Sequence, residues 1–201
     1  MADGGHVEAD DTREAILDAT YRVLCDRGYA DLSMRAIAEE SGKSKSLLHY
    51  HFDTKDDLLL AFLDRFVETL DELLAESESE HPRDRLIGFV DRFVAGPNET
   101  DRQSLWLALV EFRVRAAHDE RFREQLARTD RAKVGAIARI IEDGVDEGAF
   151  REVDPEETAE LIASALDGAR TRQATIEADS APEDVRDAIV AIVDDHLVES
   201  T

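Results

Sequence analysis

The chain has 201 residues, 43% of them hydrophobic, and its 47 acidic and 24 basic side chains give a formal net charge of -23 at pH 7. This length suits one or two compact domains with an ample core. No apolar run approaches the roughly 20 residues of a membrane-spanning helix, and the single cysteine excludes an intrachain disulfide. We therefore expect a cytoplasmic protein with no membrane partner.

The basic residues are concentrated in one segment. Three of the four lysines lie between residues 33 and 55, where four basic residues stand against three acidic ones, and only Lys133 lies elsewhere. Abundant Asp and Glu with scarce Lys indicates a halophilic composition, adapted to a salty cytoplasm. At about 1 M salt, screening limits electrostatic interactions to about 3 Å, so the overall acidity would repel DNA little. A chain that folds with full cooperativity in dilute buffer would contradict this hypothesis.

The first predicted helix follows an acidic tail. Residues 1–10 are small and acidic, which predicts a disordered segment. Apolar residues at helical spacing then begin at Asp11 or Thr12 and stop at Gly28. We therefore expect an ordered helix over about residues 11–28.

Two short helices joined by a tight turn are predicted next. Ser33 and Ser44 stand at N-cap positions, and Gly42 provides the positive φ that a residue just past a helix end often needs. This spacing predicts a helix-turn-helix. The outer face of the second helix carries the hydrogen-bonding and aromatic groups with which a helix in the major groove reaches base edges: Lys45, Ser46, His49 and Tyr50. The alternative is an ordinary polar surface helix.

The order of residues in this block adds a resemblance. The block contains, in sequence, Ser33, Arg35, Ile37, Ala38, Gly42, Ser44, Leu48, His49, His51, Phe52, Lys55 and Leu58. It resembles the N-terminal domain of the TetR family of one-component repressors. The resemblance implies an all-α chain of about nine helices. Residues 11–54 would form a three-helix DNA-binding domain with a helix-turn-helix, and residues 55–201 a helical ligand-binding and dimerisation domain.

Carried over position by position, the resemblance assigns DNA contacts to individual residues. The residues expected to contact phosphates or the groove are Ser33, Arg35, Ser44, His49 and Lys55. The residues expected to contact base edges are Lys45, Ser46 and Tyr50. Two residues depart from the family pattern: Lys43, a further candidate contact, stands where relatives carry Val, and His49 stands where they carry Tyr. A protonated His49 would still donate to a phosphate. The operator preference of relatives therefore does not transfer to this chain.

Two amphipathic helices are predicted to follow. The first begins at the N-cap Thr54, with Asp57 three residues on, and its one-sided apolar stripe runs to Leu74. Such a helix could transmit a shift between the two domains. The second begins with Pro82 at its first position and ends near residue 96.

A helix predicted over about residues 101–118 differs from the amphipathic helices before it. Its first half is apolar on every face, which predicts burial at the centre of the C-terminal domain. Its second half carries Glu111 and His118, either on a solvated, salt-bridged face or in a ligand pocket. The residues expected in the pocket are Phe66, Phe89, Trp106 and Phe112, with Glu111 or His118 as a polar anchor. An apolar pocket suits a lipophilic effector, whereas aromatic rings with a carboxylate suit a quaternary ammonium.

After a helix predicted over residues 122–150, two amphipathic helices end the chain, one starting at Asp154-Pro155 and one near Pro182. Either they complete the core or they form an interface. By resemblance they form a four-helix bundle across a two-fold axis. The expected contacts of this homodimer are Ile162, Leu166, Ile189, Ile192 and Val193. The piece Leu166 to Arg172 also resembles a segment of the choline-sensing BetI branch of the family.

No catalytic or metal-binding pattern accompanies these helices. The sequence lacks a glycine-rich phosphate loop, an HExxH motif, clustered cysteines and a nucleophile elbow, so we expect no enzyme, no metal and no cofactor. The resemblance implies a homodimeric, ligand-responsive repressor that binds palindromic double-stranded operator DNA and leaves it when a small-molecule effector enters the C-terminal domain. The alternative is a helical ligand-binding or interaction protein whose N-terminal DNA-binding domain, here called the head, no longer binds DNA. The acidic charge and the two departures from the family pattern motivate this alternative.

Overall fold

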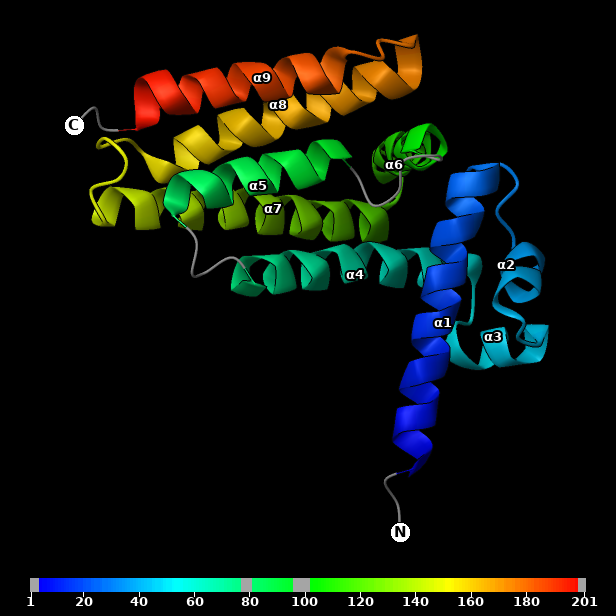
Figure 1. Cartoon of the computed structure of the whole chain (residues 1–201). Helices are drawn as coiled ribbons and strands as arrows, with labels where there is room; N and C mark the ends of the chain where they lie inside the picture. The colour runs from blue at the N-terminus through cyan, green and yellow to red at the C-terminus, as the bar shows by residue number, and fades with distance from the viewer. Residues whose placement is uncertain (1–3, 77–80, 96–101, 199–201) are drawn as a thin grey trace. The chain divides into compact units, whose positions relative to one another are not determined.

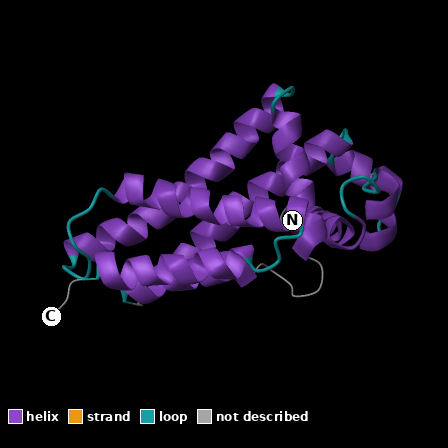
Figure 2. Ribbon diagram, turned by 90° about the horizontal axis from the view of Figure 1, so that it is seen from above, coloured by secondary structure: helices purple, strands orange, loops and turns teal. Residues whose placement is uncertain are grey.

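The computed structural model describes residues 4–76, 81–95 and 102–198. These residues form nine α-helices and a final π-helical turn, which confirms the all-α class (Figure 1). The helices are α1 (Gly4–Arg27), α2 (Met34–Ser41), α3 (Lys45–His51), α4 (Lys55–Glu76), α5 (Pro82–Ala95), α6 (Arg102–Ala116), α7 (Glu120–Asp146), α8 (Pro155–Ile176), α9 (Ala181–Ile192) and the turn η1 (Val193–Leu197). Figure 2 shows helices joined by loops and no strand in this part of the chain.

The first helix is longer than the sequence predicts. It begins at Gly4, so residues 4–10, expected in a disordered tail, belong to α1. Once the turns after Asp11 have formed, each further residue adds one hydrogen bond, and Ala and Glu among the added residues favour a helix. The helix ends where predicted, at Gly28, whose φ is 70° and whose N–H donates to the carbonyl of Leu24 at 3.0 Å.

The chain divides into two compact units. Unit 1 comprises Met1–Arg65 and Asp101–Gln125, and unit 2 comprises Phe66–Thr100 and Leu126–Thr201. Two of the three divisions fall inside α4 and α7, so each of these helices contributes residues to both units. Unit 1 therefore holds α6 together with the predicted DNA-binding segment.

In unit 1, α1 contacts both α2 and α6, and α2 contacts α3. Phe112 of α6 is fully buried, and its ring centroid lies 5.4 Å from that of Tyr29 and 6.0 Å from that of Phe122. The expectation that this helix is buried on every face is wrong, because Leu107 is 41% and Val114 64% exposed. The buried residues of α6 recur about every fourth position and form one stripe, so residues on the other faces of the helix point away from the core.

In unit 2, α8 contacts α9, and α5 contacts both. Their inner faces share one apolar core with α7 and η1. Gly144 of α7 is required here, because a Cβ at this position would lie 2.1 Å from the ring of Phe150. The buried Arg170 of α8 donates to the carbonyl of Phe93 at 2.9 Å and to that of Val94, and so holds the C-terminal end of α5.

Candidate functional site

Local signals position α3, the second helix of the predicted helix-turn-helix. The Ser33 hydroxyl accepts the N–H of Ala36 at 3.1 Å and caps α2, and the Ser44 hydroxyl accepts the N–H of Leu47 at 3.2 Å and caps α3. Between them Gly42 adopts φ 66°, in the left-handed region. Both predicted caps and the predicted turn glycine are therefore confirmed.

One face of α3 is anchored and the other is open. Leu48 is fully buried and Phe52, just past the helix, is 5% exposed. Lys45, Ser46, His49 and Tyr50 are exposed, and Tyr50 leaves 80% of its surface open. Within residues 4–76, 81–95 and 102–198, the side chain of Lys45 makes no hydrogen bond or ion pair. Cationic, hydroxyl and aromatic groups thus stand together on the exposed face of one short helix, where the Tyr50 ring makes an edge contact with the ring of His51.

The other candidate cations of the head are more constrained. Arg35 donates to Glu39 at 2.8 Å, a pair that raises the pKa of Arg35 and lowers the pKa of Glu39. Lys43 is half-buried. The Lys55 ammonium donates to the carbonyl of Leu32 at 2.5 Å, and burial lowers its pKa, although the neighbouring charge of Asp56 acts in the opposite direction. The assignment of these residues to DNA remains a prediction.

A local cap and two long-range ion pairs fix the first turn of α4. Thr54 and Asp57 form the predicted reciprocal cap, since the Asp57 carboxylate accepts the Thr54 N–H at 3.0 Å and the Thr54 hydroxyl accepts the Asp57 N–H at 3.1 Å. The Thr54 hydroxyl and then Arg121 lower the pKa of Asp57. Arg115 of α6 donates to the carboxylate of Asp56. These long-range pairs carry no local sequence signal.

Arg115 is the centre of this arrangement. Besides Asp56, its guanidinium donates to the Tyr29 hydroxyl at 3.2 Å and to the Asp119 carboxylate at 3.5 Å, and it lies 4.2 Å over the ring of Phe122. The hydrogen bond to Asp56 is the main reason that its pKa is raised. One side chain therefore joins the loop after α1, the first turn of α4 and the connection between α6 and α7.

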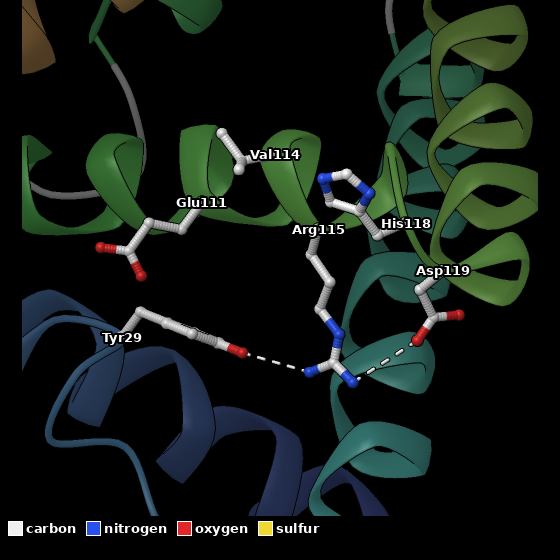
Figure 3. Close-up of a pocket in the computed structure, with 6 residues that line it drawn as sticks. All are labelled: Tyr29, Glu111, Val114, Arg115, His118 and Asp119. Atoms are coloured by element: carbon white, nitrogen blue, oxygen red, sulfur yellow. Dashed lines mark hydrogen bonds and ion pairs between the residues drawn. The ribbon is translucent and has the colours of Figure 1, made fainter.

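The predicted ligand-pocket residues are divided between the two units. Phe89 is buried in the core of unit 2 and Phe112 in the core of unit 1. Trp106 is half-buried on α6, and the side chain of Phe66 lies outside the described residues. Glu111 and His118, in contrast, line one cavity of about 550 Å³ in unit 1 (Figure 3). The remaining lining residues are Tyr29, Val114, Arg115 and Asp119.

The predicted dimer contacts are mostly core residues. Ile162, Leu166, Ile189 and Val193 are between 0% and 5% exposed and belong to the core of unit 2. They have little surface left for a partner, because the apolar stripes of α8 and α9 pack within unit 2. Of the predicted set, only Ile192 is exposed, at 43%.

The described ranges hold neither a membrane span nor a metal-binding cluster. None of their helices combines the length and apolarity needed to cross a bilayer. No group of three or more His, Cys, Asp or Glu side chains in the same ranges is placed to hold a metal ion.

Comparisons with known proteins match almost the whole chain. The family described as "Bacterial regulatory proteins, tetR family" matches residues 16–62, and "BetI-type transcriptional repressor, C-terminal" matches residues 82–199. The chain is 30% identical to the regulator BetI of Rhizobium meliloti, over 92% of this chain and 87% of that protein. It is 39% identical to the regulator TtgR of Pseudomonas putida, but over only 39% of this chain and 38% of that protein.

Solved structures show the same fold. A TetR transcription regulator from Haloarcula marismortui superposes with a TM-score of 0.81 at 36% identity, over 94% of this chain and 99% of that one. A transcriptional regulator from Saccharomonospora viridis, solved in complex with choline, superposes with a TM-score of 0.76 at 28% identity, over 95% of this chain and 100% of that one.

Proposed function

The chain belongs to the tetR family of bacterial regulatory proteins, and we propose that it is a cytoplasmic, homodimeric repressor that leaves its operator when a small-molecule effector binds. It is a transcriptional regulator, not an enzyme. The observation that carries the proposal is the open face of α3, where Lys45, Ser46 and Tyr50 are exposed on a helix fixed by the Ser44 cap and by buried Leu48. The match to a repressor C-terminal domain supports repression rather than activation.

On DNA, α3 would enter the major groove. Lys45, Ser46 and Tyr50 would contact base edges, while Ser33, Ser44 and Arg35 would contact phosphates and fix the register. Lys43 and His49 lie beside them and would add phosphate contacts. Lys55 would instead support the head from within, because its ammonium is already bonded to the carbonyl of Leu32.

A palindromic operator requires two heads related by a two-fold axis. The recognition helices must then lie about 34 to 36 Å apart, or a multiple of one DNA turn. We assign the dimer contacts to the outer faces of α8 and α9, where Leu161 is 62% and Ile192 43% exposed. Small or polar exposed residues on the same two helices, among them Ser164, Gly168 and Ala188, would let two copies approach closely.

The effector would act by binding one spacing of the heads better than another. A ligand can shift such an equilibrium only by its difference in affinity for the two states. A small lipophilic compound or a quaternary ammonium remains the candidate class, and the choline complex of the Saccharomonospora viridis regulator supports the second. The halophilic interpretation of the composition also remains a prediction.

Operator binding of the purified protein tests the proposal. We would measure affinity for the DNA upstream of its own coding sequence, at high salt, against a scrambled duplex of equal length. The double substitution Lys45→Ala and Tyr50→Ala should lower specific affinity about a hundredfold, because each base contact contributes about 1–3 kcal/mol. The matched control is Arg131→Ala, which removes an exposed cation from unit 2 and should leave operator affinity unchanged.

The same experiment separates the alternative function. A head that no longer binds DNA would show no preference for any fragment in a genome-wide selection, and the double substitution would change nothing. Circular dichroism and urea unfolding of the variant establish that its fold is intact, so a loss of binding reports on the contacts alone.

A further inference from the structure

The cavity in unit 1 has the size of a small-molecule site. Its volume of about 550 Å³ falls within the roughly 300–1,000 Å³ of typical ligand pockets. Tyr29 contributes from the segment between α1 and α2, and Glu111, Val114, Arg115 and His118 contribute from α6 and the residues just after it. Figure 3 shows Tyr29 and Glu111 reaching into the same space from these two segments.

The positive charge of the cavity is already engaged. The Arg115 guanidinium binds the carboxylates of Asp56 and Asp119 and the hydroxyl of Tyr29. Asp119 is engaged as well, since its second oxygen accepts the N–H groups of Arg121 at 3.0 Å and Phe122 at 3.5 Å at the start of α7. An anionic ligand would have to displace one of these carboxylates from Arg115.

Unlike the charge of Arg115, the negative charge of Glu111 is not engaged by a bonded partner in the described residues. In the described part of the chain its carboxylate makes no hydrogen bond or ion pair, although its charge acts on Lys55. Lys55 itself is bonded to the carbonyl of Leu32 and lies 4.5 Å over the Tyr29 ring. The Val114 methyl groups, on a residue that is 64% exposed, line an apolar part of the same cavity.

We propose that this cavity binds a small organic cation, with its ammonium group at Glu111 and its apolar part against Val114 and Tyr29. The Glu111 carboxylate supplies the counter-charge, and the apolar part of the ligand is removed from water against Val114 and the Tyr29 ring. The site lies in the unit that carries α3, apart from any effector site in unit 2. The bound cation would touch Arg115 and Tyr29, which hold the first turn of α4, so its occupancy should alter operator affinity.

The test uses three ligands that share a benzyl group and differ in charge: benzyltrimethylammonium, benzyl alcohol and phenylacetate. Binding to the full-length protein is measured by calorimetry at constant salt, and the position is read from the methyl NMR signals of Val114. We expect only the cation to bind and to shift these signals. Glu111→Gln should weaken its binding tenfold or more, whereas Glu124→Gln, an exposed glutamate of unit 1, should leave it unchanged.

Three results would overturn the inference: equal binding of benzyl alcohol, preferential binding of phenylacetate, or cation binding that is insensitive to Glu111→Gln and leaves the Val114 signals in place. The last result would assign the cation to another site and leave the repressor proposal intact. Operator binding by the unliganded Glu111→Gln protein is measured separately, so failure of the cavity site and failure of the DNA-binding proposal are distinguishable.

Discussion

Helix α3 and unit 2 use their basic residues in different ways. In unit 2, arginine and lysine side chains are bound to carboxylates of other helices, as in Arg85–Asp143 at 2.7 Å, Lys133–Asp167 at 2.6 Å and Arg186–Asp91 at 2.7 Å. On α3 of unit 1, Lys45 is exposed and has no such partner in the described residues. The difference shows which cations are committed to the fold and which remain available to a phosphate backbone.

This distribution of basic residues also bears on how a chain with a large negative charge could bind DNA. A net charge of -23 predicts repulsion from DNA, but the head is nearly neutral from residue 33 to 55. Part of the acid in unit 2 is balanced by the pairs described above, at short range. We therefore expect affinity for DNA to depend on a few exposed groups rather than on the charge of the whole chain.

The strongest test of the comparison sets Lys133 of unit 2 against Lys45 of α3. Lys133 is 7% exposed, and its ammonium binds Asp167 and lies 5.8 Å over the ring of Phe93. Lys133→Ala should lower the free energy of unfolding by about 3 kcal/mol, the low end for a broken buried pair, because Asp167 keeps some contact with water. Lys45→Ala should change it by no more than about 0.5 kcal/mol. Urea unfolding measures both.

A control keeps this prediction specific to the ion pair. Lys133→Met with Asp167→Asn retains much of the volume and removes both charges, so it should recover part of the lost stability. If Lys133→Ala were no more destabilising than Lys45→Ala, the internal lysine would have no structural role and the contrast between the units would fail.

A smaller effect separates stability from DNA binding. Ser44 caps α3 in unit 1 at 3.2 Å, and Asp154 caps α8 in unit 2 by accepting the Glu157 N–H at 2.9 Å. Ser44→Ala and Asp154→Ala should each lower the free energy of unfolding by about 1 kcal/mol. Only Ser44→Ala should also weaken operator binding, because only α3 would contact DNA. Equal losses of operator affinity in the two variants would contradict the assignment of α3.

The features that the sequence predicted correctly are local. Ser33, Ser44 and Thr54 stand within three residues of the groups they bind, and Gly42 needs only its own positive φ. Helix starts and the helix-turn-helix follow from such short-range signals. The first turns of α1 were missed because extending an existing helix needs no signal of its own.

The features that the sequence did not predict depend on which apolar face meets which neighbour. Ile162 and Ile189 lie on regular stripes, and the same stripe can fill a core or cover an interface. The sequence also gave no sign that Phe89 and Phe112, both expected in the pocket, belong to the cores of different units. Arg115 and Asp56 are 59 residues apart, so only the tertiary structure reveals their ion pair.

The smallest predicted effect concerns Arg35, a cation of the head that is paired with a carboxylate of its own helix. Arg35 and Glu39 are both exposed on α2 and bind each other at 2.8 Å. Glu39→Gln removes the negative charge and releases the guanidinium, so operator affinity should rise by about two- to tenfold. Glu160→Gln, at an exposed position of unit 2, makes the same charge change and should have no comparable effect.

The salt dependence of binding shows how Glu39→Gln acts. If the released Arg35 takes a phosphate, one more counterion is displaced, and the slope of log affinity against log salt should steepen by about 0.9. If only the repulsion by Glu39 is lost, affinity rises while the slope stays closer to that of the wild type. An affinity that does not rise would mean that Arg35 and Glu39 both lie away from the DNA. The Arg35–Glu39 pair would then be structural, and DNA binding would depend on α3 and the groups beside it.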